Sequence, residues 1–183
     1  YNLLWRRIIR ENRISPRDLI RAIALFPTAV YAAHLMRQEG INHIHAHYAT
    51  YPALVAWLIH HLTGISYSIT VHAHDIFVRT TMLSTKLQDA AFIAAISEYN
   101  RHYLTRVVGP WIRDKIHIVH CGISPHHYRP CTDSYDRSKP FEIISIGSLQ
   151  PYKGFPYLLR ACAVLRDRGI PIRCRIIGGG QES

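Results

Sequence analysis

Two short segments of the sequence carry side chains that could bind a ligand or take part in a reaction. The first, His72-Ala-His-Asp75, directly follows an apolar, β-branched run. The second, Gly147-Ser-Leu-Gln-Pro-Tyr-Lys-Gly154, connects an apolar run to a helical pattern. In an open parallel sheet, ligands bind beyond the carboxyl ends of the strands. Both segments are therefore candidate sites.

The second segment has the chemistry of a phosphate site. Its small residues let the backbone approach a ligand, the helix start offers free N–H groups to a phosphate, and Lys153 adds a positive charge. The Gly178–Gly180 run follows the next apolar run and has the same topological position. A glycine-containing turn between a strand and a helix is more often structural, so both interpretations stay open at this stage.

The chain has 13 histidines, and two clusters of them raise a metal-binding hypothesis. The clusters are His43, His45 and His47, which alternation along a strand would put on one face, and His72, His74 and Asp75. No carboxylate or cysteine joins the first cluster, and the HxHxDH pattern of metallohydrolases fails in the second because the aspartate follows His74 immediately. We predict no metal site. Ser97 has no GxSxG context and is expected to cap a helix instead of acting as a nucleophile.

Helical and strand patterns alternate along the chain. Helices are expected at 17–38, 51–62, 83–89, from Ser97 through Leu104, and at 155–167, and short apolar strands at 41–46, 67–71, 91–96, 116–119, 141–146 and 172–177. Ser15-Pro16 marks one helix start, and Gly40, Gly64 and Gly169 mark helix ends. This alternation predicts an α/β fold with parallel sheets that are covered on both faces.

The composition changes once along the chain, between two α/β stretches. Residues 123–139 are polar and proline-bearing and are interpreted as a linker. It separates a first domain at 1–122 from the start of a second at 140–183. The chain opens without methionine and stops at Gly178-Gly-Gly-Gln-Glu-Ser183, where a new element should begin. We expect both domains to be incomplete.

The charge balance is basic, with 22 Lys and Arg against 12 Asp and Glu, which favours anionic partners. The longest apolar stretch, 22–33, contains Pro27 and is too short to span a bilayer, and no signal peptide is visible. Basic residues without interleaved aromatic side chains give no support for nucleic-acid binding. They are Arg6, Arg7, Arg10, Arg13, Arg17 and Arg21. The four cysteines, Cys121, Cys131, Cys162 and Cys174, are too widely spaced for a CxxC pair and are expected to be reduced in the cytosol.

Five segments together resemble the family-4 retaining glycosyltransferases of the GT-B fold, and most closely the bacterial enzymes of exopolysaccharide and colanic-acid-type assembly. The resemblance covers nearly the whole chain, in order and in spacing. The segments are His43-Ile-His-Ala-His-Tyr-Ala49, Thr70-Val-His-Ala-His-Asp-Ile-Phe77, Ile96-Ser-Glu-Tyr-Asn-Arg101, Ile118-Val-His-Cys-Gly-Ile123 and Gly147-Ser-Leu-Gln-Pro-Tyr-Lys-Gly154.

The resemblance implies two Rossmann-like, doubly wound domains with a cleft between them, the acceptor mainly on the first and the nucleotide-sugar donor mainly on the second. His72 matches the histidine that meets the transferred sugar, and we expect it to be the catalytic contact. Lys153 matches the lysine that neutralises the donor pyrophosphate, which stabilises the charge on the leaving nucleotide. The remaining implied positions are Gly147, Ser148 and Gly154 for the donor, and His74, Asp75, Ser97 and Glu98 for the acceptor or the cleft.

The sequence departs from the family pattern at two points. Ser148 stands where an arginine commonly contacts the diphosphate, and Cys121 occupies an asparagine position. The family's Glu-x7-Glu element would lie beyond residue 183, so this chain alone is expected to be inactive.

The expected function is retaining transfer of a sugar from a UDP- or GDP-sugar to a glycan or lipid-linked acceptor, without cofactor or metal. The expected location is cytoplasmic, peripheral on the inner face of the plasma membrane. Two alternatives stay open: a metal-dependent hydrolase that uses His72 and His74, and a basic, non-enzymatic binding module.

Overall fold

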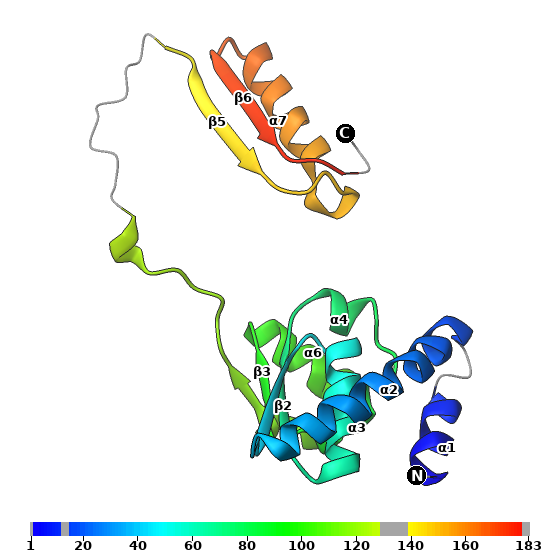
Figure 1. Cartoon of the computed structure of the whole chain (residues 1–183). Helices are drawn as coiled ribbons and strands as arrows, with labels where there is room; N and C mark the ends of the chain where they lie inside the picture. The colour runs from blue at the N-terminus through cyan, green and yellow to red at the C-terminus, as the bar shows by residue number, and fades with distance from the viewer. Residues whose placement is uncertain (1, 12–14, 129–138, 181–183) are drawn as a thin grey trace. The chain divides into compact units, whose positions relative to one another are not determined.

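A computed structural model of the chain describes residues 2–11, 15–128 and 139–180 (Figure 1). The chain divides into two compact units, Tyr1–Ile123 and Ser124–Ser183, called unit 1 and unit 2 below. Both are mixed α/β structures with parallel strands, so the predicted fold class is confirmed at this level. The predicted domain roles and boundaries stay predictions. Most of the predicted linker, together with Arg13, Cys131 and 181–183, lies outside the described residues.

Unit 1 has a four-stranded parallel sheet of β1 (His43–His47), β2 (Ser66–Val71), β3 (Ile93–Ala95) and β4 (Ile116–Ile118). The strands lie in chain order, with Ile69 beside Ile93 and Ile93 beside Ile116 in the register. The helices of unit 1 are α1 (Asn2–Glu11), α2 (Pro16–Gln38), α3 (Tyr51–Thr63), α4 (His74–Phe77), α5 (Leu83–Asp89), α6 (Glu98–Val108) and the 3-10 helix η1 (Pro110–Lys115).

The helices that connect the strands pack on one face of this sheet. Because strand order follows chain order, right-handed crossovers put every connecting helix on the same side. Tyr67, Ile69 and Val71 of β2 are fully buried there, in one core with residues of α3, α5 and α6, and Figure 1 shows α2 and α3 on one side of the strands. The expectation that both faces are covered is therefore wrong for the described part of unit 1. The opposite face carries the histidines of β1.

Helix α2 begins and ends as its sequence predicts. The Ser15 Oγ accepts a hydrogen bond from the Asp18 N–H at 3.3 Å, and Pro16 occupies the first turn. Pro27 lies inside the helix and does not end it, so the apolar segment is longer than the stretch of 22–33 that we predicted to be too short to span a bilayer. With 23 residues, α2 is long and apolar enough to cross a membrane, a property that helices of soluble proteins share.

Unit 2 consists of the parallel pair β5 (Phe141–Ile146) and β6 (Ile172–Ile177), with α7 (Phe155–Asp167) on one face. The bounds of these three elements match the predicted ranges, which are confirmed. Side chains alternate along the strands: Ile143 and Cys174 are half-buried, whereas Ile144 and Ile177 are exposed. Two short 3-10 helices, η2 (Pro125–His127) and η3 (Pro151–Lys153), complete the unit.

The cysteines in the described part of the chain are Cys121, Cys162 and Cys174, and all three are free thiols. Cys162 on α7 and Cys174 on β6 line the same surface hollow. Burial of Cys174 and its contact with the Cys162 thiol raise the pKa of Cys174. A raised pKa disfavours the reactive thiolate at neutral pH.

Candidate functional site

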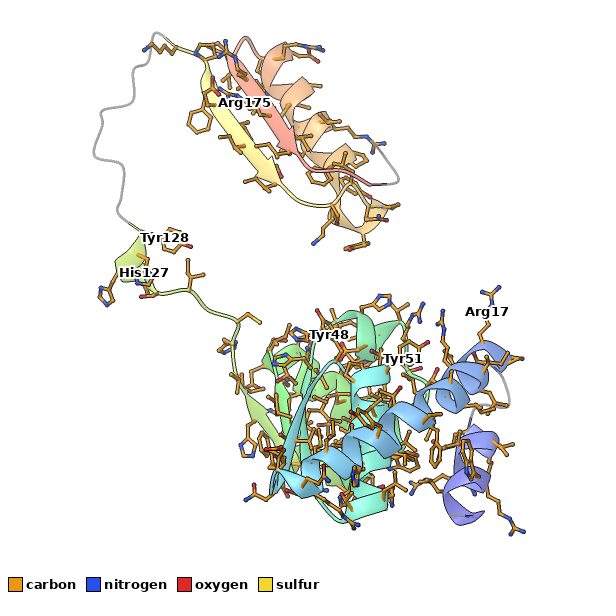
Figure 2. All side chains as sticks on the ribbon, in the orientation of Figure 1. Arg17, Tyr48, Tyr51, His127, Tyr128 and Arg175 are labelled. Atoms are coloured by element: carbon orange, nitrogen blue, oxygen red, sulfur yellow. The ribbon has the colours of Figure 1, made fainter. Side chains whose placement is uncertain are left out.

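The carboxyl ends of the strands in unit 1 bring together residues that are far apart in the sequence. Tyr48 follows β1, His72 follows β2 and Ser97 comes two residues after β3. Tyr48 has a φ of 76°, which is unusual for a residue other than glycine. This conformation lets its ring lie against that of His72, with the ring centroids 4.5 Å apart. Figure 2 shows Tyr48 at this end of the unit, close to α4.

The backbone of His72 is fixed from two sides. Its N–H donates to the Asp75 carboxylate at 3.0 Å, and its C=O accepts from Asn100 Nδ2 at 2.8 Å. The imidazole itself is half-buried, between the Tyr48 ring and the His47 ring, whose centroid is 6.1 Å away. It can therefore exchange hydrogen bonds with a ligand hydroxyl while its position is held by groups that do not touch the ligand.

Asp75 is fully buried, and its carboxylate accepts only backbone N–H groups among the described residues. Besides His72, the Ala49 N–H donates to its Oδ2 at 2.7 Å. One carboxylate therefore joins the segment after β1 to the segment after β2. We predicted Asp75 as a cleft residue, and the structure places it beneath the surface, where it can act on a ligand only through His72.

The other predicted residues of unit 1 differ in accessibility. Ser97 caps α6 as predicted, since its Oγ accepts the Asn100 N–H at 3.2 Å. Glu98 is exposed and forms an ion pair with Arg101, and His74 is exposed in the first turn of α4. Asn100 was missed. It is 4% exposed, and its bond to His72 spans 28 residues, so no local pattern could reveal it.

The histidines of β1 lie on one face of the strand, as alternation predicts, and His43 and His45 bond to hydroxyls of β2. His43 contacts the Oγ atoms of Ser66 and Ser68, both at 2.8 Å from its ring nitrogens. His45 contacts Ser68 Oγ at 2.6 Å and Thr70 Oγ1 at 2.7 Å. All four ring nitrogens of these two residues are occupied, which leaves none for a metal ion. Within the residues that the structure describes, no group of three or more His, Cys, Asp or Glu could hold a metal.

This histidine row makes the stability of unit 1 depend on pH. Burial, and then the neighbouring His47 and His43, lower the pKa of His45. A histidine with a lowered folded pKa binds fewer protons than in the unfolded chain, so stability falls as the pH drops below the unfolded value of about 6.5. We expect the urea midpoint of unfolding to decrease between pH 7 and pH 5, and His45→Gln to flatten this decrease.

His102→Gln is the matched control for that measurement. His102 is exposed on α6. The control should keep the pH dependence of the parent chain, and an equal flattening in both variants would contradict the role of His45.

In unit 2, the loops after β5 and β6 run side by side. The Gly147 N–H donates to the Ile177 C=O and the Leu149 N–H to the Gly179 C=O, both at 3.0 Å. A Cβ on Gly178 would lie 1.8 Å from the Gly147 oxygen, and one on Gly180 would lie 2.4 Å from the Leu149 oxygen. Close approach of the two backbones therefore requires glycine at 178 and 180, whereas a side chain at 179 would meet open space.

Gly147, Ser148, Lys153 and Gly154 lie in one continuous loop between β5 and α7. The Lys153 side chain is exposed, with its Nζ 5.3 Å from the centroid of the Tyr152 ring, and Gly154 turns the chain with a φ of 73°. The start of α7 offers fewer free N–H groups than expected. Pro156 has none, and the Tyr157 N–H already donates to the Gly154 C=O at 3.0 Å. A phosphate at this loop would therefore depend mainly on the Lys153 ammonium.

No protein-family model matches the chain, and a comparison with curated proteins finds no similar sequence. The assignment of a function depends on the residues and on the geometry of the two strand-end sites. Unit 1 offers a fixed imidazole beside an aromatic ring. Unit 2 offers a glycine-rich loop with one free cation.

Proposed function

We propose that the chain is part of a retaining glycosyltransferase of the GT-B type, similar to family 4, which transfers a sugar from a UDP- or GDP-sugar. One observation carries the proposal. The segments that resemble this family include or follow the carboxyl ends of parallel strands in both units, where α/β folds bind ligands. In this proposal unit 1 binds a glycan or lipid-linked acceptor and unit 2 binds the donor.

His72 and Lys153 have separate roles in the proposed reaction. The imidazole of His72, fixed through its backbone, contacts the sugar that is transferred, and the Tyr48 ring offers an apolar surface beside it. Lys153 compensates the charge that develops on the departing nucleoside diphosphate. The acceptor hydroxyl attacks the sugar on the same face from which the nucleoside diphosphate departs, so the anomeric configuration is retained. No cofactor or metal is required in this scheme.

A location on the cytoplasmic face of the membrane fits the proposed acceptor. Exposed basic residues on α1 and α2, among them Arg6, Arg10 and Arg17, would be attracted to anionic lipids. The exposed apolar side chains of α2, such as Ile20, Ile23 and Tyr31, are compatible with peripheral contact with a membrane. Both groups lie in unit 1, on which the acceptor would bind.

Lys153→Ala tests the donor site. We expect at least a tenfold loss in affinity for UDP or GDP, about 1.4 kcal/mol, because a charge-assisted contact with phosphate is removed. Calorimetry measures the affinity, and turnover in the complete protein should fall by a similar factor. Arg166→Ala is the control, since Arg166 is an exposed cation near the other end of α7. Unchanged affinity and turnover in Lys153→Ala would remove this assignment.

A further inference from the structure

A second group of charged residues surrounds Tyr51, at the same end of unit 1 as Tyr48. Figure 2 shows Tyr51 at the start of α3 and Arg17 projecting from the first turn of α2. Arg17, Arg21 and Arg79 line a cavity of about 250 Å³. Arg21, Arg79 and Tyr51 also line an adjoining hollow of about 420 Å³. We call these two spaces the arginine pocket.

Two guanidinium groups of the pocket converge on one oxygen atom. The Tyr51 hydroxyl donates to the Asp18 carboxylate at 3.0 Å. Its oxygen accepts from Arg21, and from Arg79 at 3.3 Å. The Arg21 guanidinium also lies over the Tyr51 ring, 5.4 Å from its centroid. Tyr51 therefore orients both guanidinium groups and leaves most of their N–H donors available.

The carboxylate of the pocket is a single negative charge among three arginines, and its hydrogen bonds go to hydroxyl groups. Asp18 accepts hydrogen bonds from the hydroxyls of Ser15 at 2.7 Å and Thr81 at 2.8 Å, in addition to Tyr51. The Ser15 bond is the main cause that lowers the pKa of Asp18 and keeps it ionised. Among the described residues, none of the three arginines forms an ion pair within 4.0 Å.

A buried lysine adds positive charge beneath the pocket. Lys86 is 3% exposed, and its ammonium donates to the Thr81 C=O at 2.7 Å. It lines a small cavity of about 30 Å³ that also contacts Asp18, Tyr51 and Arg79. Burial lowers the pKa of Lys86 to about 8, so the side chain is mostly charged at neutral pH. The two arginine-lined spaces and the small cavity thus bring three guanidinium groups and this ammonium near one carboxylate, whose oxygens already accept hydrogen bonds from three hydroxyls.

We infer that the arginine pocket binds a phosphate ester. Guanidinium groups bind phosphate oxygens in pairs of parallel hydrogen bonds, and here two of them are held in place by one hydroxyl. Ala24 and Leu25 line the wider hollow, which gives room for the carbon chain of such an ester next to its phosphate. The site lies wholly in unit 1, whereas the donor loop lies in unit 2, so the two sites share no residue.

The experiment measures binding of two phosphate esters by the Arg21→Gln/Arg79→Gln double variant. Glycerol 3-phosphate is the soluble probe, and vesicles of phosphatidylglycerol with phosphatidylcholine are the lipid probe, with phosphatidylcholine vesicles as the blank. We expect the double variant to lose at least tenfold in affinity for one or both probes. A loss for glycerol 3-phosphate alone identifies a soluble ester as the ligand, and a loss for the vesicles alone identifies a lipid phosphate.

Three further variants separate this site from other causes. Arg113→Gln removes an exposed arginine of η1 and should bind both probes as the parent chain does. Lys153→Ala should also bind both probes unchanged, which excludes the donor loop. Tyr51→Phe keeps every charge and removes the hydroxyl that orients the arginines, so it should weaken binding about threefold. Parental affinity of the double variant for both probes would overturn the inference, with circular dichroism as the check on its folding.

Discussion

His72→Ala is expected to lower the turnover number of the proposed sugar transfer about 100-fold, the usual effect of removing one fixed polar contact to a transition state. The structure supplies the reason for a large effect. The backbone of His72 is held on one side by Asp75 and on the other by Asn100, so the imidazole needs little reordering when substrate binds. Groups that are positioned before the reaction stabilise charge more effectively than mobile ones.

Steady-state kinetics of the complete protein would measure this effect. The KM for the nucleotide sugar should change less than threefold, because the loop at 147–154 supplies the phosphate contact in our proposal. His102→Ala, at an exposed position of α6, serves as the control. A turnover number within threefold of the parent in His72→Ala would refute the assignment of His72 as the catalytic contact.

Asp75→Ala is expected to destabilise unit 1 by about 3 kcal/mol. The substitution removes the acceptor of the buried Ala49 N–H and of the partly buried His72 N–H, and each buried unsatisfied group costs roughly 1–3 kcal/mol. Asp75→Asn keeps one acceptor oxygen and should lose less. Urea unfolding, followed by circular dichroism, gives the free energy of unfolding of each variant.

The control for this prediction is Asp114→Ala. Asp114 is an exposed carboxylate of η1, and surface substitutions of this kind change stability by about 0.5 kcal/mol or less. Equal losses at both positions would mean that the Asp75 carboxylate does not hold the strand ends together. A loss in Asp75→Ala that far exceeds the control, accompanied by a lower turnover number, would support its role in positioning His72.

Most elements of the fold were predictable because their signals are local. Ser15 and Ser97 mark helix starts through hydrogen bonds to residues three positions away, and Gly64 ends α3 in the left-handed conformation that glycine adopts most easily. The alternation of strands and helices likewise predicted parallel sheets. One-sided coverage of the sheet was not predictable. It depends on the order of the strands, and no local pattern in the sequence encodes that order.

The residues of the candidate site also differ in whether a local signal in the sequence could predict them. The positions of His72 and of the loop at 147–154 after strands could be predicted because an apolar run followed by a polar or glycine-containing segment is visible in the sequence. Asn100 was missed because its contact with His72 depends on the packing of α6. In the sequence, Arg21 was only one of several basic residues without interleaved aromatic side chains, because its partner Tyr51 lies 30 residues further along the chain. Residues that position others, or that gather from several elements, become visible only in three dimensions.

The chain-ordered sheet of unit 1 also has a consequence for how the protein folds. β2, β3 and β4 each pair with the strand that precedes them in the described chain, so each of these pairings needs only one crossover. Structures dominated by contacts between nearby segments fold faster, because less chain entropy is lost before the contacts form. During synthesis, β2 can join β1 before β3 has been made, and β3 and β4 can follow in turn. We therefore expect unit 1 to assemble progressively from its N-terminal strand, without waiting for unit 2.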